Sequence, residues 1–249
     1  MKLRITHISD THNKHNQITE DLPGGDIIIH SGDFSSIGRK SESQTFVKWF
    51  GKLPYKHKIF IAGNHDLSFE SERLFRMKSD WFDGRKDYDE PAEEGKPYWV
   101  SELLEFLPDG VIYLENESVE IEGVKIWGSP FSARFGRDWA FNIDRGEKSR
   151  ELWSTIPSDT NILITHGPAF GVGDRNNDGL HVGCEDLRER VINLEPDIHL
   201  SGHIHEAYGY THFGNTHSIN GSNLNLNYLY MNKPITFDYD FETKEIEFI

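Results

Sequence analysis

Carboxylate, imidazole and carboxamide side chains gather at five separated points of the sequence. They stand in the short stretches SDTH (9–12), SGDF (31–34), AGNHD (62–66), THGP (165–168) and SGHIH (201–205). Oxygen and imidazole donors together suit hard or borderline divalent cations such as Mn²⁺, Fe²⁺ or Zn²⁺. We therefore expect a metal centre. Its candidate ligands are Asp10, His12, Asp33, Asn64, His166, His203 and His205.

The number of candidate ligands indicates two ions. A catalytic ion usually keeps about three or four protein ligands and an open position for water, so seven candidates overfill one site. A carboxylate has two oxygens and can hold two metals about 3.5–4 Å apart with a hydroxide between them. That geometry is the one used for phosphoester hydrolysis.

An Ile-rich apolar run leads into each of these stretches. The runs are LRITHIS (3–9), DIIIHS (26–31), KIFIAG (58–63), NILITH (161–166) and DIHLSG (197–202). Such runs are typical of strands buried on both faces, and the carboxyl ends of strands in α/β sheets form a ligand-binding crevice. Glycines at 32, 63, 167 and 202 are expected to let the backbone turn and to leave room for a ligand.

Helical patterns lie between some of the runs. Residues 41–53 begin with Ser41 and Gln44 at capping-box spacing, and residues 183–193 place Leu187, Val191 and Ile192 on one helical face. Strands that alternate with helices predict an α/β layered fold. We expect one domain over residues 1–249, a sandwich of sheets with outer helices.

Toward the end of the chain the pattern of apolar and polar residues changes. The ranges 122–128, 209–221 and 233–249 alternate apolar and polar residues around turns, as antiparallel hairpins do. The sequence therefore predicts that a mostly parallel half of the sandwich joins a more antiparallel half.

The composition of the chain limits the kinds of partner and metal site that we expect. The chain has 249 residues and a formal net charge of −15, which disfavours nucleic acid polymers but allows a small phosphate ester bound at a metal ion. The single cysteine, Cys184, excludes a cysteine-based zinc cluster and is expected to be a small buried side chain in a reducing compartment. No signal peptide or long apolar run is present, so we expect a cytoplasmic protein outside the membrane. The oligomeric state stays open.

The five stretches, in the order DTH, GDF, GNHD, THGP and GHIH, resemble the ordered blocks of the calcineurin-like metallophosphoesterases. The segments GSPF (128–131), THGPAFG (165–171), VGCEDL (182–187) and GHIHEAYG (202–209) resemble the small metallophosphoesterase-domain-containing subfamily, which includes phosphodiesterases. The resemblance implies a four-layer sandwich, in which helices flank two mixed β-sheets. It also implies that Asp10, His12 and His205 bind the first ion, that Asn64, His166 and His203 bind the second, and that Asp33 bridges them.

The same resemblance keeps His65 off the metals, facing the substrate as a phosphate-stabilising group or general acid. Phosphoprotein phosphatases of the family carry an Asp-Arg-Gly continuation after the Gly-Asp block, whereas this chain reads GDFSSIGRK (32–40), so that activity is disfavoured. We expect a phosphodiesterase that hydrolyses a small phosphodiester, such as a cyclic nucleotide, with Mn²⁺ as the expected metal and Fe or Zn as alternatives. The alternatives are a phosphomonoesterase on a nucleotide or other small phosphate ester and a non-catalytic scaffold, although all eight family positions are present.

The remaining polar residues have structural or accessory roles in our interpretation. His7 and His30 lie inside strand runs and are expected to be buried and hydrogen-bonded. Asp66 either orients His65 or anchors the turn, and we favour the turn. Structural or surface positions are expected for His15, His57, His181, His199, His212 and His217.

Three loops, at 67–97, 131–145 and 171–183, are expected to set specificity. The third of them, which carries His181, is also a candidate to close over the substrate. The second offers weak candidates for phosphate contact in Arg134 and Arg137. Its aromatic residues either stack on a base or cover the core, and we expect core for most of them. They are Phe131, Phe135 and Trp139.

Overall fold

Two six-stranded mixed sheets form the centre of the computed structural model, which describes residues 2–71, 75, 95–136 and 138–249. The first sheet has the order β14–β13–β1–β2–β3–β4 and the second the order β11–β12–β10–β9–β6–β5. The strands of the first are β1 (Lys2–Ile8), β2 (Gly25–Ser31), β3 (Tyr55–Ile61), β4 (Val111–Tyr113), β13 (Ile235–Asp240) and β14 (Glu245–Phe248). Those of the second are β5 (Glu117–Ile121), β6 (Val124–Ser129), β9 (Ile162–Thr165), β10 (Ile198–Ser201), β11 (Gly209–Phe213) and β12 (Thr216–Asn220).

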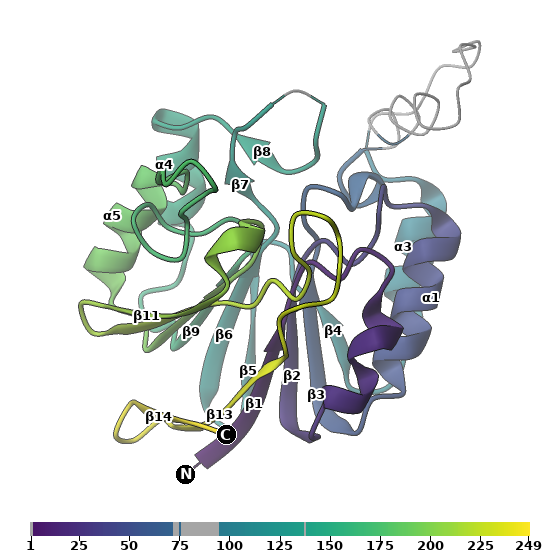
Figure 1. Cartoon of the computed structure of the whole chain (residues 1–249), viewed down its shortest axis with the longest axis horizontal. Helices are drawn as coiled ribbons and strands as arrows, with labels where there is room; N and C mark the ends of the chain where they lie inside the picture. The colour runs from purple at the N-terminus through teal and green to yellow at the C-terminus, as the bar shows by residue number, and fades with distance from the viewer. Residues whose placement is uncertain (1, 72–74, 76–94, 137) are drawn as a thin grey trace.

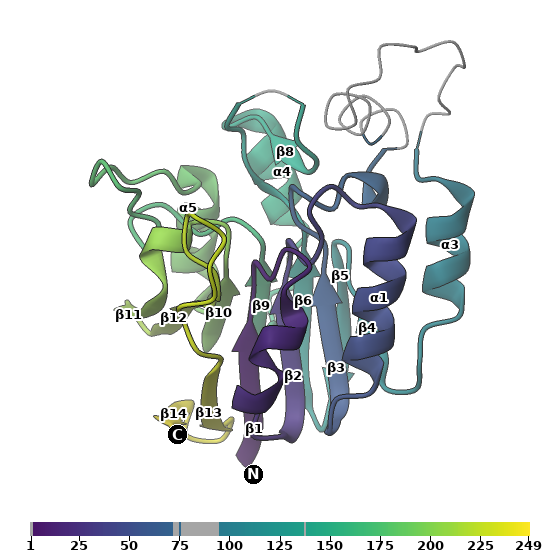
Figure 2. The ribbon, with the colours of Figure 1, turned by 45° about the vertical axis from the view of Figure 1, so that its right-hand side comes forward.

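Helices cover the outer faces of both sheets (Figure 1). Helices α1 (Lys40–Gly51) and α3 (Tyr98–Glu105) lie on the first sheet, and α4 (Glu147–Ser154) and α5 (Glu185–Leu194) lie on the second, as the turned view also shows (Figure 2). The shorter elements are the 3₁₀ turns η1 (His15–Asp21), η2 (Leu67–Phe69) and η3 (His205–Ala207) and the two-stranded pair β7 (Ser132–Ala133) and β8 (Asn142–Ile143). The four layers predicted from the sequence are confirmed.

Alternation of side chains along the central strands explains the layers. In β2, Ile27 and Ile29 enter the core between the sheets, whereas Ile28 packs with Phe46 of α1. Because successive strand residues point to opposite faces, a strand buried on both faces needs apolar residues at nearly every position. The continuous Ile-rich runs meet that requirement.

The predicted division into a parallel half and an antiparallel half is wrong. Strands β1 to β4 run parallel in the first sheet, and β6, β9, β10 and β12 run parallel in the second. The antiparallel hairpins lie at the edges of both sheets, because the β13–β14 hairpin returns to the first sheet and pairs Tyr239 with Leu3 of β1. Local patterns identify a hairpin but do not say which sheet it joins.

Two helical details also differ from the sequence prediction. Helix α1 begins at Lys40 rather than after Ser41, and the Glu42 carboxylate caps it by accepting the backbone N–H of Arg39 at 3.0 Å. In α5, Leu187 and Val191 are buried, but Ile192 is half exposed because it lies one residue, about 100° of helix, further round. Cys184 is buried as expected.

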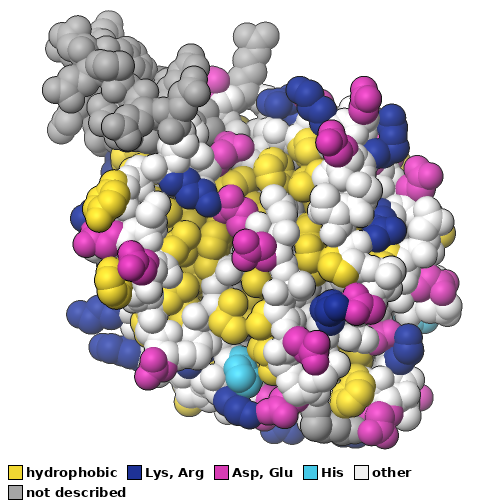
Figure 3. Space-filling model, turned by 180° about the vertical axis from the view of Figure 1, so that it is seen from behind, with side chains coloured by type: hydrophobic (Ala, Val, Ile, Leu, Met, Phe, Trp, Pro, Cys, Tyr) yellow, Lys and Arg dark blue, Asp and Glu magenta, His cyan; other side chains and the backbone are white. Residues whose placement is uncertain are grey.

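The carboxyl ends of β1, β2, β3, β9 and β10 meet at one end of the sandwich, opposite the end where both termini lie (Figure 1). The loop between β12 and β13 lies over these strand ends. Within the described residues, no helix has the length and apolar character needed to cross a membrane. On the face shown in Figure 3, Lys and Arg side chains lie among Asp and Glu side chains rather than in one basic patch.

Candidate metal centre

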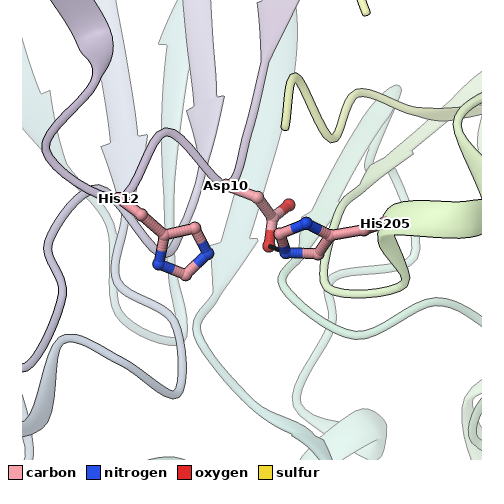
Figure 4. Close-up of side chains that lie close together, drawn as sticks. All are labelled: Asp10, His12 and His205. Atoms are coloured by element: carbon pink, nitrogen blue, oxygen red, sulfur yellow. Dashed lines mark ion pairs between the residues drawn. The ribbon is translucent and has the colours of Figure 1, made fainter. Parts of the chain in front are cut away.

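The predicted ligands come together at these strand ends. Asp10, His12 and His205 offer donor atoms that all lie within 4.8 Å of one another, and Figure 4 shows this first group. The second group is Asp33, His166 and His203, within the same limit. Two groups of three fit two cations better than one.

Asp33 lies between the two groups. Its Oδ2 atom is 3.4 Å from Nε2 of His166 and 3.9 Å from Nε2 of His12, which belongs to the first group. The Asn64 side chain completes the surroundings of the second group, since its Oδ1 lies 2.9 Å from Nε2 of His166. Asp33 is thus the carboxylate placed to contact a cation in either group.

Backbone carbonyls fix the orientation of four histidine rings. Because a carbonyl only accepts, each paired Nδ1 carries the proton and leaves Nε2 free to bind a cation, the arrangement common among metal-binding histidines. The pairs are His12 with Ser35 at 3.2 Å, His65 with Ser36 at 2.7 Å, His166 with Ser31 at 2.9 Å and His205 with Asn225 at 3.2 Å.

Nε2 of His12 provides an independent test of the fit to a cation. This atom is buried and has no hydrogen-bond partner among the described residues. A buried polar atom without a partner is costly, at about 1–3 kcal/mol, unless a ligand satisfies it. The oxygen and imidazole donors around it are those that Mn²⁺, Fe²⁺ and Zn²⁺ accept.

The two aspartates are anionic at neutral pH. Burial tends to raise the pKa of Asp10, but the hydrogen bond and charge of His205 hold that pKa well below its usual range. Burial acts in the same direction on the pKa of Asp33, and the charges of His166 and His65 lower it far more. Asp10 also accepts the backbone N–H of His203 at 2.9 Å, which ties β1 to the turn after β10.

The histidines divide into two kinds. Burial lowers the pKa of His166 and His205, yet the neighbouring Asp33 and Asp10 outweigh it and raise both pKa values to about 9. Burial dominates at His12 and His203, whose pKa values fall to about 3. Protons therefore compete with cations at the first two residues and hardly at the last two.

Four candidate ligands adopt a strained backbone. Asp10, His12, Asp33 and His203 have φ angles of 53°, 37°, 57° and 68°. The left-handed region costs a residue with a Cβ about 1–2 kcal/mol, and such strain concentrates at functional sites. All four residues stand in the turns that follow β1, β2 and β10, where the chain leaves the sheets.

The glycines beside the cluster leave space for the side chains of the candidate metal ligands. We had expected that space to be left for a bound molecule, and this expectation is wrong. A Cβ atom at Gly202 would lie 2.3 Å from Oδ2 of Asp10, and one at Gly63 would lie 2.4 Å from Oδ1 of Asp33. Among the four glycines predicted to matter, the turn itself requires glycine at Gly32, whose φ is 99°.

Asp66 holds the turn that carries Asn64 and His65. Its buried carboxylate accepts the backbone N–H groups of Gly63 at 2.8 Å and of Asp33 and Ser35 at 3.0 Å. This is the structural role that we favoured from the sequence. His65 offers a donor atom within 4.8 Å of those of His12 and Asp33.

A cavity of about 160 Å³ opens beside the donor groups. Its polar wall is formed by Asp33, Asn64, His65, His203 and His205, and its rim by Phe135, Leu226 and Tyr228. Leu226 and Tyr228 were not identified from the sequence. They stand in the run NLNLNYLYM (223–231), which begins by alternating polar and apolar residues and has four exposed apolar side chains in the structure.

The aromatic residues of the second loop divide between core and cavity. Phe131 and Trp139 pack against the helix-side cores, as expected for most of them, whereas Phe135 lines the cavity. The Trp139 ring also packs on the ring of His65, with 4.4 Å between ring centres. Arg134 is paired with Asp144. Arg137 lies outside the described residues, as do 72–74 and 76–94 of the first loop.

Other predicted residues take structural positions. His7 and His30 are buried and hydrogen-bonded to Ser31 and Thr11, as expected. His181 pairs with Asp174 at 2.6 Å within its own loop and is not among the residues that line the cavity.

Comparisons with known proteins agree with this geometry. A family model described as calcineurin-like phosphoesterase matches residues 3–207. Human metallophosphoesterase domain-containing protein 1 is 38% identical over 238 residues, which cover 94% of this chain and 70% of the relative. A UPF0046 protein of Caenorhabditis elegans is 36% identical over 242 residues, 95% of this chain and 81% of that protein. The solved structure of TT1561 of Thermus thermophilus has a TM-score of 0.59 at 11% identity, covers 100% of this chain and 99% of its own, and shows the same fold.

Proposed function

This chain belongs to the calcineurin-like phosphoesterase family, and from that membership we propose that it hydrolyses small phosphodiesters, such as a cyclic nucleotide, with two divalent cations. The observation that carries the proposal is that Asp33, which belongs to the second group of three metal-binding side chains, also lies beside His12 of the first group. In phosphoryl transfer, negative charge develops on the attacking and the leaving oxygens of the phosphate, and two neighbouring cations can stabilise both.

Each group of residues would hold one cation, with Mn²⁺ as the expected ion. Asp10, His12 and His205 would bind the first, Asn64, His166 and His203 the second, and Asp33 both. Bound there, the cations would neutralise phosphoryl oxygens and lower the pKa of water from 15.7 toward about 7, so that a nucleophile forms at neutral pH. The low pKa values of Asp10 and Asp33 keep both carboxylates ready to bind.

His65 would act on the substrate rather than on the cations. Ser36 fixes the proton on its Nδ1 at 2.7 Å, and Trp139 packs on the ring, so Nε2 is the atom that faces the cavity. A proton carried on Nε2 would stabilise a phosphoryl oxygen or pass to the leaving oxygen. General acid catalysis of this kind contributes about 10²–10⁴-fold.

Charge favours a diester over a monoester. The cavity wall contains no Lys or Arg within the part of the chain that the structure describes. A monoester dianion carries one more negative charge than a diester, and proteins usually match such charge with Arg or Lys. A diester monoanion therefore has less need of a positive side chain in addition to the two cations.

The test uses protein reconstituted with Mn²⁺. Matched chromogenic phosphodiester and phosphomonoester substrates are compared first, and then 2′,3′- and 3′,5′-cyclic nucleotides. We expect the diester to be hydrolysed with the higher kcat/KM. A preference for the monoester would replace the proposal with a phosphomonoesterase, and no hydrolysis of any ester would favour a scaffold.

A further inference from the structure

Two loops place apolar side chains at the rim of the cavity, outside the three hydrophobic cores. Phe135 comes from the segment between β7 and β8, and Leu226 and Tyr228 come from the segment between β12 and β13. Their exposed fractions are 37%, 48% and 42%. Apolar side chains gathered around a polar cavity mark a ligand-binding surface.

The aromatic rings of the rim contact the histidines of the metal centre. The ring centre of Phe135 lies 4.6 Å from that of His203, and the ring centre of Tyr228 lies 4.8 Å from that of His12. The two rings therefore border the place where the phosphate of a substrate would bind.

Tyr228 is held there at a cost. Its φ angle is 55°, a left-handed conformation that is unfavourable for a residue with a side chain. The Asn225 carboxamide supports the turn by accepting the backbone N–H groups of Asn227 at 2.9 Å and Leu229 at 3.0 Å, and Lys14 donates to the Tyr228 carbonyl. In the described chain, the hydroxyl of Tyr228 has no hydrogen-bond partner, whereas that of Tyr230 donates to Asp21 at 2.5 Å. Hydrogen bonds therefore hold the backbone of this turn, and the Tyr228 hydroxyl is not used in them.

The size of the cavity decides which part of a substrate it can take. Its volume of about 160 Å³ is well below the ~300–1,000 Å³ of pockets that bury a whole organic ligand. A phosphate group fits against the polar wall. The organic group of the ester must then extend across the rim.

We propose that Phe135 and Tyr228 are specificity-determining residues that stack on a planar aromatic group of the ester, a nucleobase or an aryl ring. This inference rests on the proposed function, because it assigns the organic half of the same substrate. Stacking of a base on one aromatic side chain contributes about 1–3 kcal/mol. The rim thus selects aromatic over alkyl esters, while the metal centre recognises the phosphate that both share.

Binding, rather than turnover, provides the test. Calorimetric titrations of the Mn²⁺-loaded protein use 5′-AMP, methyl phosphate and inorganic phosphate. We expect Tyr228→Leu to weaken AMP binding by about 5- to 150-fold, the equivalent of one base stack. Affinity for methyl phosphate and inorganic phosphate should change by less than about twofold, since the stack is absent from both.

Two further variants separate the ring from other effects. Tyr228→Phe keeps the ring and should retain AMP affinity within about threefold. Tyr98→Leu removes a tyrosine on α3 that is 83% exposed and serves as the matched control, with no change for any ligand. A loss in Tyr228→Phe as large as in Tyr228→Leu would overturn the stacking role.

The inference and the proposed function fail in different ways. Equal weakening of AMP and inorganic phosphate by Tyr228→Leu, or no weakening of either, would overturn the inference even if the wild-type protein hydrolyses diesters. Conversely, a wild-type protein that binds Mn²⁺ but hydrolyses no ester would contradict the proposed function, and the AMP titration would still test the rim.

Discussion

The strand-end cluster and the rim of the cavity lie side by side but are built in different ways. The cluster (Asp10, His12, Asp33, Asn64, His166, His203 and His205) is mostly buried and fixed by hydrogen bonds to the backbone. The rim (Phe135, Leu226 and Tyr228) is more than one third exposed and stands on two connecting loops. Under the proposed function, the cluster would recognise the phosphate of a substrate and the rim would recognise its organic group, so the two halves of the substrate would contact separate parts of the fold. Changes in the cluster should alter cation binding and turnover, and changes in the rim should alter affinity for the organic group.

The largest effect is expected from Asp33→Asn in the cluster. Loss of the carboxylate between the two groups should weaken both cation sites together, because an amide has no charge to share between them. We expect turnover to fall to the level of chelated protein and Mn²⁺ content, measured by elemental analysis, to fall from two equivalents toward none. Loss of only one equivalent would contradict the position of Asp33 between the sites.

The variant His65→Ala, next to the cluster, is expected to lower turnover without removing a cation. Without the Nε2 proton, kcat should fall by about 10²–10⁴-fold, while the protein still binds two Mn²⁺. Elemental analysis and steady-state kinetics on the same preparation check both points. Near wild-type turnover would remove the assigned role, and loss of a cation equivalent would show that His65 is itself a ligand.

The free energy of unfolding, measured as a function of pH, tests whether His166 and His205 hold protons in the absence of a cation. In chelated protein, His166 and His205 have folded-state pKa values of about 9, above the ordinary 6.5, so their stabilisation is present below pH 6.5 and is lost as pH rises through 9. The free energy of unfolding should therefore decrease between pH 6.5 and 9. In Mn²⁺-loaded protein the free energy of unfolding should change little over this range, because histidines that bind a cation stay deprotonated throughout and have no proton to lose.

The control for the pH titration is the double variant His166→Gln and His205→Gln. It lacks both titrating groups and should show little dependence over the same range when chelated. A chelated wild-type protein with the same flat profile would show that the carboxylates do not hold protons on these histidines.

The smallest effect is expected from Phe135→Leu in the rim. Loss of one aromatic face should raise the KM for an aromatic diester by about 2- to 10-fold, as for other aromatic pairs, with kcat and Mn²⁺ content unchanged. Kinetics with aryl and alkyl diesters give the measurement. A fall in kcat or in bound Mn²⁺ would mean that the rim and the cluster are not separate.

The sequence predicted the cluster better than the rim for a physical reason. Polar residues directly after buried strands are visible as a pattern, and parallel strands bring their carboxyl ends together whatever the loops do. The left-handed backbone of Asp10 and Asp33 was not predictable, because it depends on hydrogen bonds from remote turns. Tyr228 was missed because its position depends on a turn built by Asn225 and Lys14 and not on any periodic pattern.

The same distinction between local patterns and remote contacts explains which parts of the fold could be predicted. The apolar runs predicted the central strands, because a strand buried on both faces needs apolar residues at nearly every position, and the family resemblance implied the four layers. The sheet joined by the last hairpin was not predictable, because the pairing of Leu3 with Tyr239 spans nearly the whole chain. The cap of α1 was assigned to Ser41 because serine and glutamine match the usual spacing, whereas the Glu42 carboxylate caps the helix in the structure.

The contact between Asp10 and the backbone of His203 has a consequence for the synthesis of the protein. The two residues are 193 positions apart. At about 5–20 residues per second, a ribosome needs about 10–40 s to translate the segment between them. Until that segment has been translated, a nascent chain carries Asp10 and His12 without His205 and cannot assemble the first group of donors. A cation that needs all three residues would therefore bind only after the segment that carries His205 has left the ribosome.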